Sequence, residues 1–446
     1  MAATPTPPVD HPPFATPPPD PELAGAALCT HCGYCLPVCP TYRSALNEMQ
    51  SPRGRVSIVL ALQGGRLQAE EAVAALSYCL NCRACHPACP ANVQPVQLIQ
   101  KVRSRAPEKT RLSARLLHFI TNRPRWTAWL AKMIQFYGQS GLQSGVRRFR
   151  LLVFSATLTR LEGLIPPWRA PLTPLANPAS AFEPLPSPTN PRPRVGLMAG
   201  CLARLFYPGV ENASVHLLTQ MGFEVVRPPD FGCCGASDLE GGKRGDLFKK
   251  ARSNLLAFEA LEPLEAIICD SATCAVTARQ YGKILADDPQ WRDQAERFSA
   301  KVQPLSRFLA QNHWPRHLTP HDPGLGELTF HDHCQTQNEL GTIKEPRALL
   351  GALPVKLKEL PRAERCCGAG GETMMRHPDA SREIRRDKLA AIQASQADTV
   401  IGENPGCLLN IEAGLVQEKS PTQVRHLAEA LWAAMNNPIK SKFEQL

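Results

Sequence analysis

The second half of the chain alternates short apolar runs with longer amphipathic stretches. Runs of strand length occupy Val195 to Met198, Glu224 to Arg227 and Ala266 to Ile268. Helical stretches such as Lys249 to Leu261 lie between such runs. Strands that alternate with helices of this length form largely parallel sheets covered by helices. The pattern therefore predicts α/β layers beyond residue 195.

Aromatic and aliphatic residues at helical spacing mark the stretch before these layers. Trp126, Trp129, Met133 and Tyr137 recur on a strongly basic background. Residues 101–165 hold 13 Lys and Arg against two acidic residues, a net charge of +11, whereas the whole chain carries +10. Such a helix either lies on an anionic membrane surface or an acidic partner, or covers its own domain with its arginines in solvent. Both interpretations stay open at this point.

Proline-rich segments separate the parts of the chain. Residues 1–21 contain nine prolines, and ten of the 29 residues from 166 to 194 are prolines. Proline sustains neither a helix interior nor a central strand. We expect a disordered tail at 1–21 and a linker at 166–194.

The cysteine content indicates the compartment. The 17 cysteines are odd in number and cluster at short spacings, which is typical of thiolate metal ligands in a reducing compartment and predicts a cytoplasmic protein. No run reaches the roughly 18 apolar residues of a membrane-spanning helix, and we expect no secretory signal.

Two cysteine runs near the N-terminus share one spacing. Each reads C-x2-C-x2-C-x3-C-P and ends at Pro40 or Pro90. In such runs three close thiolates hold one 4Fe–4S cluster, and the fourth cysteine ligates the neighbouring cluster. One cluster is therefore predicted on Cys29, Cys32, Cys35 and Cys89, and the other on Cys79, Cys82, Cys85 and Cys39. Zinc is the alternative metal, but it does not need a doubled four-cysteine run.

The residues around these runs are less informative. Arg53, in the Ser-Pro-Arg-Gly-Arg stretch that begins at Ser51, is expected either between the clusters or on a partner carboxylate.

Cysteines also reveal an internal duplication. Cys201, Cys233, Cys234 and Cys274 recur 133 residues later as Cys334, Cys366, Cys367 and Cys407. Each Cys pair precedes a glycine, Gly235 or Gly368. Four matches at one offset predict two similar lobes, and loops after parallel strands would bring these cysteines to one edge of each sheet.

Three interpretations of the lobe cysteines remain open. They hold an iron–sulfur cluster in each lobe, which we favour, or they hold zinc or another structural metal, or they form a thiol site that reduces a disulfide. Cys269 has no duplicate and is expected to be buried and inert or an accessory ligand. The histidines between Phe330 and Cys334 are expected to satisfy local backbone groups, without a catalytic role.

The resulting fold class is a helical ferredoxin-like two-cluster domain followed by two duplicated α/β Cys-Cys-Gly lobes. The expected division is a tail at 1–21, the two-cluster domain at 22–104, basic helices at 105–165, a linker at 166–194, and the lobes at 195–325 and 326–435.

The order of these motifs resembles the iron–sulfur subunit of bacterial glycolate oxidase over about residues 25–432. Related families are the iron–sulfur subunits of lactate utilisation enzymes and of anaerobic glycerol-3-phosphate dehydrogenase, and the catalytic subunit of heterodisulfide reductase. In the glycolate enzyme, flavoprotein subunits oxidise the 2-hydroxy acid and the iron–sulfur subunit passes electrons toward the respiratory chain. The resemblance thus implies FAD-binding flavoprotein partners and an acceptor such as quinone, with no substrate oxidation by this chain alone. We expect no nucleic-acid partner.

Two other functions compete with this one. Heterodisulfide reductases carry a C-x2-C pair at the end of each lobe motif, but here Ser271 and Asn404 stand three residues before Cys274 and Cys407. That departure weakens disulfide chemistry. The lobes could also be a metal-stapled docking module.

Overall fold

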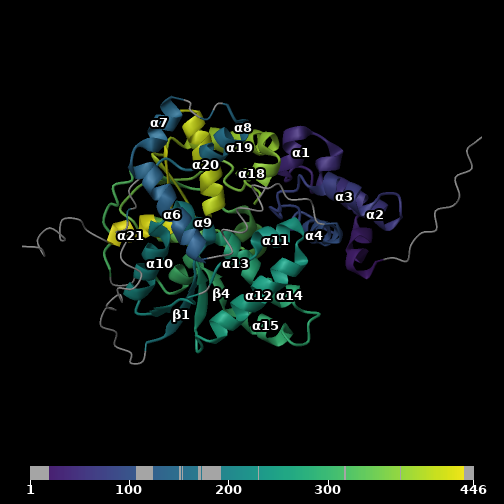
Figure 1. Ribbon diagram of the computed structural model, residues 1–446, viewed down its shortest axis with the longest axis horizontal. Coiled ribbons are helices and arrows are strands. Elements are labelled where there is room, and N and C mark those ends of the chain that lie inside the picture. Colours follow the sequence, from purple (N-terminus) through teal and green to yellow (C-terminus); the bar gives the residue numbers. More distant parts are fainter. Residues whose placement is uncertain are drawn as a thin grey trace, which may run out of the picture.

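The computed structural model describes residues 20–106, 124–149, 152, 154–168, 172, 192–229, 231–315, 318–371 and 373–435. These residues form a helical N-terminal domain, three further helices and two α/β lobes (Figure 1). The predicted fold class is confirmed. Nearly all of the predicted tail and most of the predicted linker lie outside the described residues.

The N-terminal domain consists of short helices around an apolar core. Its elements are η1 (Pro21–Leu28), α1 (Pro40–Ala45), η2 (Glu48–Gln50), α2 (Pro52–Gln63), α3 (Ala69–Leu76) and α4 (Pro95–Arg105). Proline at the first position starts α1, α2 and α4, because a missing N–H costs nothing there. The Ser51 hydroxyl caps α2 by accepting from the Gly54 N–H at 2.9 Å. A Cβ at Gly54 would lie 1.9 Å from the Glu48 carbonyl oxygen, so the backbones meet closely there.

Three helices follow in the basic stretch: α6 (Pro124–Gln139), α7 (Leu142–Arg148) and α8 (Ala156–Gly163). Helix α6 packs against the lobes through α9 (Cys201–Phe206). Arg147 joins α7 to α8 by an ion pair with Glu162 at 2.8 Å. None of the helices in the described part of the chain combines the length and the apolar character needed to cross a bilayer.

Each lobe is built on a four-stranded parallel sheet. The first has the strand order β2-β1-β3-β4, with β1 (Arg194–Met198), β2 (Glu224–Val226), β3 (Ala266–Cys269) and β4 (Val302–Pro304). The second repeats this order as β6-β5-β7-β8, with β5 (Leu328–Phe330), β6 (Leu357–Lys358), β7 (Thr399–Gly402) and β8 (Gln423–His426). The inner strands β3 and β7 are buried along their whole length, as expected of parallel strands covered on both faces.

Helices connect the strands in both lobes. In the first lobe these are α9, α10 (Gly209–Gln220), α11 (Ala236–Gly241), α12 (Arg244–Glu259), α13 (Ala272–Ala278), α14 (Tyr281–Ile284), α15 (Arg292–Lys301) and α16 (Leu305–Gln311). In the second they are η3 (Thr336–Leu340), a π-helical turn, and α17 (Lys344–Gly351), α18 (Thr373–Arg376), α19 (Pro378–Ser395), α20 (Pro405–Gln417) and α21 (Leu427–Met435).

The two lobes share one hydrophobic core. Apolar side chains from Val195 in the first sheet to Val400 in the second belong to the same buried cluster. Helix α10 packs against α21 across the junction, where His216 stacks on Trp432 at 4.3 Å between ring centroids. The lobes are thus held rigidly enough to form a joint site between them.

The N-terminal domain lies against the lobes, as Figure 1 shows for α1 beside α18 and α19. Arg83 forms an ion pair with Glu339 of the second lobe at 2.7 Å, and Arg43 forms one with Asp387 at 2.6 Å. The Arg83 side chain is almost fully buried, so this pair is shielded from solvent.

Candidate metal centres

The two N-terminal cysteine loops have the same backbone shape. His31 and Asn81, 50 residues apart, both have left-handed backbone, with φ of 56° and 53°. Gly33 and Arg83 repeat the feature two residues later, with φ of 88° and 61°. Loops that turn twice in this way curl back on themselves, and this brings closely spaced thiols together.

The structure places Cys39 with the cysteines of the second loop. A negative charge on Cys39 would raise the pKa of Cys82 and of Cys85, and one on Cys79 would raise the pKa of Cys85, so these thiols lie close together. These are the four residues for which the sequence predicts one shared cluster. Cys35 adjoins the same group, because a charge on it would raise the pKa of Cys85, and a charge on Cys39 would in turn raise the pKa of Cys35. In the first loop Cys29 acts on Cys35, and Cys89 accepts a hydrogen bond from the Val93 N–H at 3.3 Å.

Arg55 is the residue that sequence reasoning missed. Its guanidinium is buried, donates to the Thr41 hydroxyl at 2.8 Å and lies 3.8 Å from Cys39 Sγ. Burial opposes its charge, but Cys79 and Cys39 outweigh burial and raise its pKa. A buried cation requires nearby negative charge, which thiolates bound to metal would provide.

Arg53 has a different role from either that the sequence suggested. It pairs with Glu48 of the same chain at 2.7 Å and donates to the His31 carbonyl at 3.1 Å, at the protein surface. The positions Arg53 and Arg55 differ only in the side of α2 on which they lie. The sequence does not say which side of this helix faces the cysteine loops, so it could not tell the two arginines apart.

Two thiols of the second loop, Cys82 and Cys85, hold their protons tightly. Burial raises the pKa of Cys82 and of Cys85 well above that of an ordinary thiol, and neighbouring cysteines add to this effect. A cluster must therefore displace these protons when it binds. Cys32 of the first loop is exposed, so the first cysteine set opens to the surface and the second lies inside.

In the first lobe, the duplicated cysteines meet at the carboxyl edge of the sheet. Cys201 begins α9 after β1, Cys233 and Cys234 follow β2, and Cys274 lies in α13 after β3. Hydrogen bonds link the thiols in the order Cys201, Cys233, Cys234, Cys274. Hydrogen bonds from Cys201 and Cys234 place the pKa of Cys233 well below the usual range.

The second lobe repeats this arrangement with Cys334, Cys366, Cys367 and Cys407, again linked by hydrogen bonds in that order. In both lobes the glycine after the Cys pair has left-handed backbone, with φ of 81° at Gly235 and 83° at Gly368. Each of these glycines donates its N–H to the first thiol of its pair at 3.4 Å. A Cβ at Gly368 would lie 2.5 Å from the Ser381 carbonyl oxygen.

One cavity of about 170 Å³ joins the two lobe sites. All eight duplicated cysteines line it, together with Met374 and Met375 of the second lobe. Leu80 of the N-terminal domain lines it as well. Across the junction the Ser271 hydroxyl donates to Asn404 Oδ1 at 3.3 Å. Ser271 and Asn404 occupy the positions where the heterodisulfide reductase motif has cysteine, and they are hydrogen-bonded to each other.

The second cysteine loop is in contact with the second lobe. Cys82 and Cys334 pack against the same small apolar cluster, which includes Leu80 and Cys366. Asn338 donates to the Cys82 carbonyl at 2.9 Å. The cysteine sets therefore form one series, from the exposed first loop through the second loop to the cavity between the lobes.

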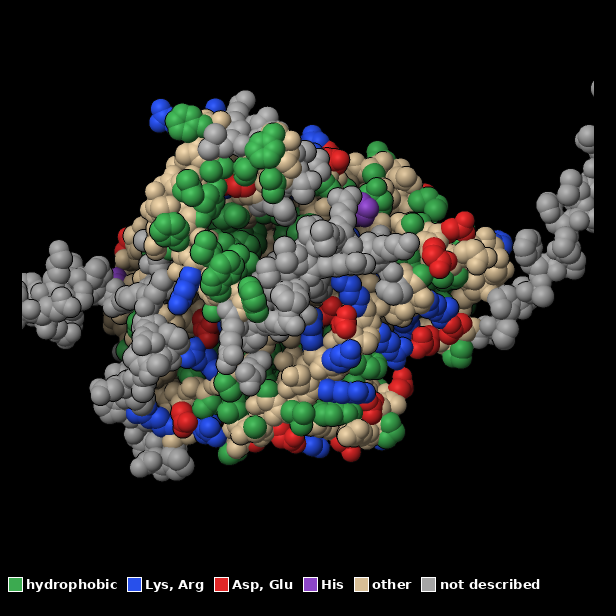
Figure 2. Space-filling view, viewed as in Figure 1, with side chains coloured by type: hydrophobic (Ala, Val, Ile, Leu, Met, Phe, Trp, Pro, Cys, Tyr) green, Lys and Arg blue, Asp and Glu red, His purple; other side chains and the backbone are tan. Residues whose placement is uncertain are grey.

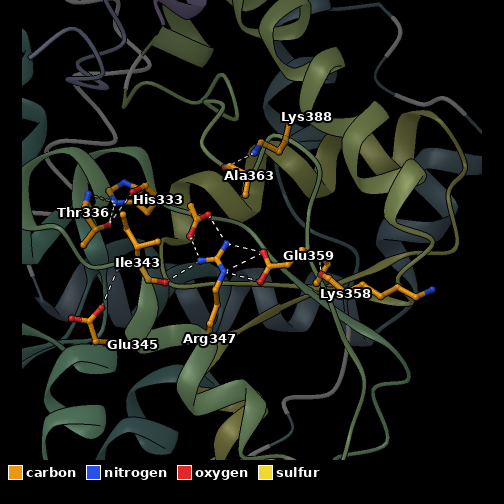
Figure 3. Close-up of polar contacts among 11 residues, drawn as sticks. His333, Thr336, Ile343, Glu345, Arg347, Lys358, Glu359, Ala363 and Lys388 are labelled. Carbon is orange, nitrogen blue, oxygen red and sulfur yellow. Dashed lines mark hydrogen bonds and ion pairs between the residues drawn. The ribbon is translucent and has the colours of Figure 1, made fainter. Parts of the chain in front are cut away.

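The structure separates the two histidines of the second lobe. His333 follows in part the expectation of a histidine that satisfies local groups, because it contacts the Thr336 hydroxyl at 2.6 Å and accepts from the Thr336 N–H (Figure 3). Its Nε2 also contacts the Thr273 hydroxyl of the first lobe at 3.3 Å. His331 does not follow this expectation. It is buried, and neither ring nitrogen has a hydrogen-bond partner in the described part of the chain. Burial holds its pKa well below the usual range, with Lys388 and His333 contributing.

The remaining unduplicated cysteine is buried. Cys269 Sγ lies 3.7 Å from Met198 Sδ, at the end of β3. Burial raises its pKa well above that of an ordinary thiol. These surroundings fit an inert packing residue.

Comparisons with known proteins agree with the motifs. A family model described as a cysteine-rich domain matches residues 195–279 and again 328–412, and one described as a 4Fe–4S dicluster domain matches residues 25–93. The probable glycolate oxidase iron–sulfur subunit of Bacillus subtilis is 33% identical over 420 residues, which cover 91% of this chain and 93% of that protein. Lactate utilization protein A of Halalkalibacterium halodurans is 32% identical over 53% of this chain and 96% of its own length. The protein of the same name from Shouchella clausii is 31% identical over 53% of this chain and 98% of its own length.

Proposed function

Because this chain belongs to the family of glycolate oxidase iron–sulfur subunits, we propose that it takes electrons from an FAD-binding flavoprotein and passes them toward the respiratory chain. The flavoprotein would oxidise glycolate or a similar 2-hydroxy acid to the 2-oxo acid, which releases two electrons and two protons. This chain would carry the electrons singly, and a quinone would receive both of them with two protons.

The observation that carries this proposal is the continuous series of cysteine sets. It starts at the exposed Cys32, passes the buried second loop and reaches the lobe cavity through Cys82 and Cys334. Bound 4Fe–4S clusters supply one-electron redox chemistry. Cys29, Cys32, Cys35 and Cys89 would hold one, and Cys79, Cys82, Cys85 and Cys39 the other. The donor set fits, because all of these cysteines are free thiols.

The lobes would extend the series beyond the two clusters. Their cysteines would bind a further iron–sulfur cluster or zinc, and the buried surroundings would keep water away from it. The protein would stay in the cytoplasm, as a peripheral protein on the inner face of the membrane.

The surface that supports membrane contact is the outer face of α6, α7 and α8, here called the helical face. Trp126, Trp129, Met133 and Phe136 are exposed to between 46% and 63% on α6, and Phe149 and Phe154 are exposed beyond it. Figure 2 shows hydrophobic side chains gathered over this part of the surface. Residues 124–163 carry six Lys and Arg against Glu162 alone, and Arg147 already neutralises Glu162. Aromatic side chains among basic ones fit an anionic phospholipid surface.

Reduction by a partner tests the proposal. The purified chain should be brown and free of flavin. Glycolate should reduce it only when the flavoprotein subunits are added under anaerobic conditions. Bound flavin together with glycolate oxidation by the chain alone would contradict the proposal.

The rival function is reduction of a disulfide at the lobe cysteines. A chemically reduced preparation would then turn over a disulfide substrate, and Cys366→Ala or Cys367→Ala would abolish turnover. We expect no such turnover, because Ser271 and Asn404 stand where that chemistry has cysteines.

A further inference from the structure

His331 is a buried polar group that the proposed electron route does not use. It follows the last residue of β5 and is only 2% exposed. Both ring nitrogens lack hydrogen-bond partners among the described residues. A buried imidazole without partners is costly, and such exceptions in native proteins usually have a functional reason.

The surroundings of His331 identify that reason. One of its ring nitrogens and the sulfur atoms of Cys367 and Cys407 all lie within 4.8 Å of one another, and all three residues are buried. Bonds of about 2.0–2.3 Å to a tetrahedral zinc ion would place such ligand atoms roughly 3.5–4 Å apart. A small inward movement of the three side chains would therefore bring them onto one ion.

The first lobe has no equivalent histidine. The duplication places Met198 at the position of His331, 133 residues earlier. Met198 Sδ lies 3.7 Å from Cys269 Sγ, and Gly402 replaces Cys269 in the second lobe. The first lobe thus has an inert sulfur contact where the second lobe has an imidazole nitrogen beside its cysteines.

Charge also distinguishes the second lobe. Lys388 is completely buried, close to Cys366 and Cys367 and within reach of the carboxylates of Asp332 and Glu364; the first lobe has Leu255 at this position. Its ammonium group donates to the Ala363 carbonyl at 3.0 Å (Figure 3). A buried ammonium group needs negative charge nearby. A divalent ion held by three thiolates and one neutral imidazole would carry a net charge of about −1, which Lys388 would neutralise.

We propose that the second lobe binds a single zinc-class ion through the imidazole of His331 and the thiolates of Cys367 and Cys407. Cys366, the neighbour of Cys367 in the chain, lies outside this group of three and would turn toward the ion to supply the fourth ligand. The two lobes then differ in metal chemistry: the first is an all-thiolate site and the second a mixed nitrogen and sulfur site. This inference rests on the proposed function only for the assignment of the lobe cysteines as metal ligands.

Metal analysis of the full chain tests the inference. The protein would be produced with both iron and zinc in the medium and purified without oxygen. We expect about one zinc ion per chain beside the cluster iron. His331→Ala should lose most of the zinc and keep the iron, whereas the matched first-lobe variant Met198→Ala should keep both.

Spectroscopy provides a second readout that does not depend on the folding of one variant. The extended X-ray absorption fine structure at the zinc edge of the wild-type chain should show one nitrogen and about three sulfur neighbours. In His331→Gln, which keeps side-chain volume and polarity, the nitrogen contribution should disappear.

The contrary outcomes separate two failures. Zinc that is unaffected by both His331 variants, or a second lobe that contains iron in place of zinc, overturns this inference and leaves the electron carrier standing. A chain with no metal outside the N-terminal domain overturns both this inference and the assignment of the lobe cysteines.

Discussion

The thiol of Cys39 belongs by sequence to the first cysteine run, yet it lies close enough to Cys82 and Cys85 of the second, as well as to Cys35, for a charge on it to raise their pKa values. Cys39→Ser should therefore impair the cluster held by Cys79, Cys82 and Cys85 and spare the other. Iron analysis and electron paramagnetic resonance of the reduced protein would show loss of one of two signals. The control Cys269→Ala changes a buried cysteine outside the series and should keep both signals. Loss of the same signal in Cys39→Ser and in Cys32→Ser would contradict the exchange of ligands.

Arg55 provides a second prediction for a single residue. Arg55→Met removes a buried cation 3.8 Å from Cys39 Sγ and leaves the thiolate charge without compensation. We expect the free energy of unfolding of the cluster-loaded protein to fall by about 3 to 5 kcal/mol. The reduction potential of the nearer cluster should become more negative, because reduction adds an electron where positive charge has been lost.

The matched variant for this prediction is Arg53→Met, on the surface of the same helix. Its pair with Glu48 is exposed, so solvent screening should leave it with little effect on the free energy of unfolding. Equal effects of the two variants on stability and potential would contradict the role given to Arg55.

Single residues also show what a sequence can and cannot reveal. The spacing of Cys29 to Cys35 and of Cys79 to Cys85 is itself the signature of the site, so the motif could be read directly. Arg55 and His331 could not be recognised. Their roles depend on the burial of both side chains and on the lack of hydrogen-bond partners for the ring nitrogens of His331 among the described residues. Nothing in the order of residues states either property.

At the scale of elements, the ends of β3 and β7 carry a duplicated pair of buried carboxyl groups. Asp270 and Glu403 stand 133 residues apart, and burial raises the pKa of each to about 7. Between about pH 4 and pH 7 the folded chain keeps protons that the unfolded chain releases, so the free energy of unfolding falls as the pH rises. Urea unfolding across this range should show the slope.

Amide variants test the source of that slope. Asp270→Asn and Glu403→Gln should each flatten it, whereas Glu265→Gln, an exposed group on the same lobe as Asp270, should not. Asp270 also accepts from the Gly200 N–H at 2.6 Å, which the asparagine oxygen can preserve. Slopes that are the same in all four proteins would rule out these carboxyl groups as the cause.

The helical face should bind anionic membranes through the exposed aromatic side chains of α6. The double variant Trp129→Ser with Phe136→Ser removes two exposed aromatic side chains from α6 and should weaken binding to phosphatidylglycerol vesicles roughly tenfold. Added salt should weaken binding of the wild-type chain as well, because basic residues contribute. Vesicle co-sedimentation measures both effects.

The control for the helical face is Leu256→Ser, which changes a residue of α12 that is 54% exposed. It should bind vesicles like the wild-type chain. If the wild-type chain ignored anionic vesicles, and the α6 variant lost flavoprotein binding, the helical face would be a protein interface and membrane contact would be excluded.

The sequence predicted the arrangement of helices and strands where its cysteine motifs repeat. The offset of 133 residues predicted two similar lobes, and parallel sheets with one strand order confirm them. The core shared through α10 and α21 could not be foreseen. Apolar helix faces look alike whether they cover their own sheet or a neighbouring lobe.

On the scale of the whole molecule, the arrangement of the parts gives the function a direction. The first cysteine set opens to the surface at Cys32, and the second set contacts the second lobe through Cys82 and Cys334. Motif spacing predicted the ligand sets, but only the packing of the N-terminal domain against the lobes gave the order in which these cysteines lie. That order is the basis for an electron carrier with an exposed end and a buried end.

The central claim is that eight N-terminal cysteines hold two neighbouring 4Fe–4S clusters. The most direct measurement is iron content together with electron paramagnetic resonance of the anaerobically purified and reduced chain. A brown sample with at least about eight iron atoms per chain, and with signals broadened by coupling between two nearby clusters, is the predicted result. A colourless sample that contains zinc alone would contradict the account.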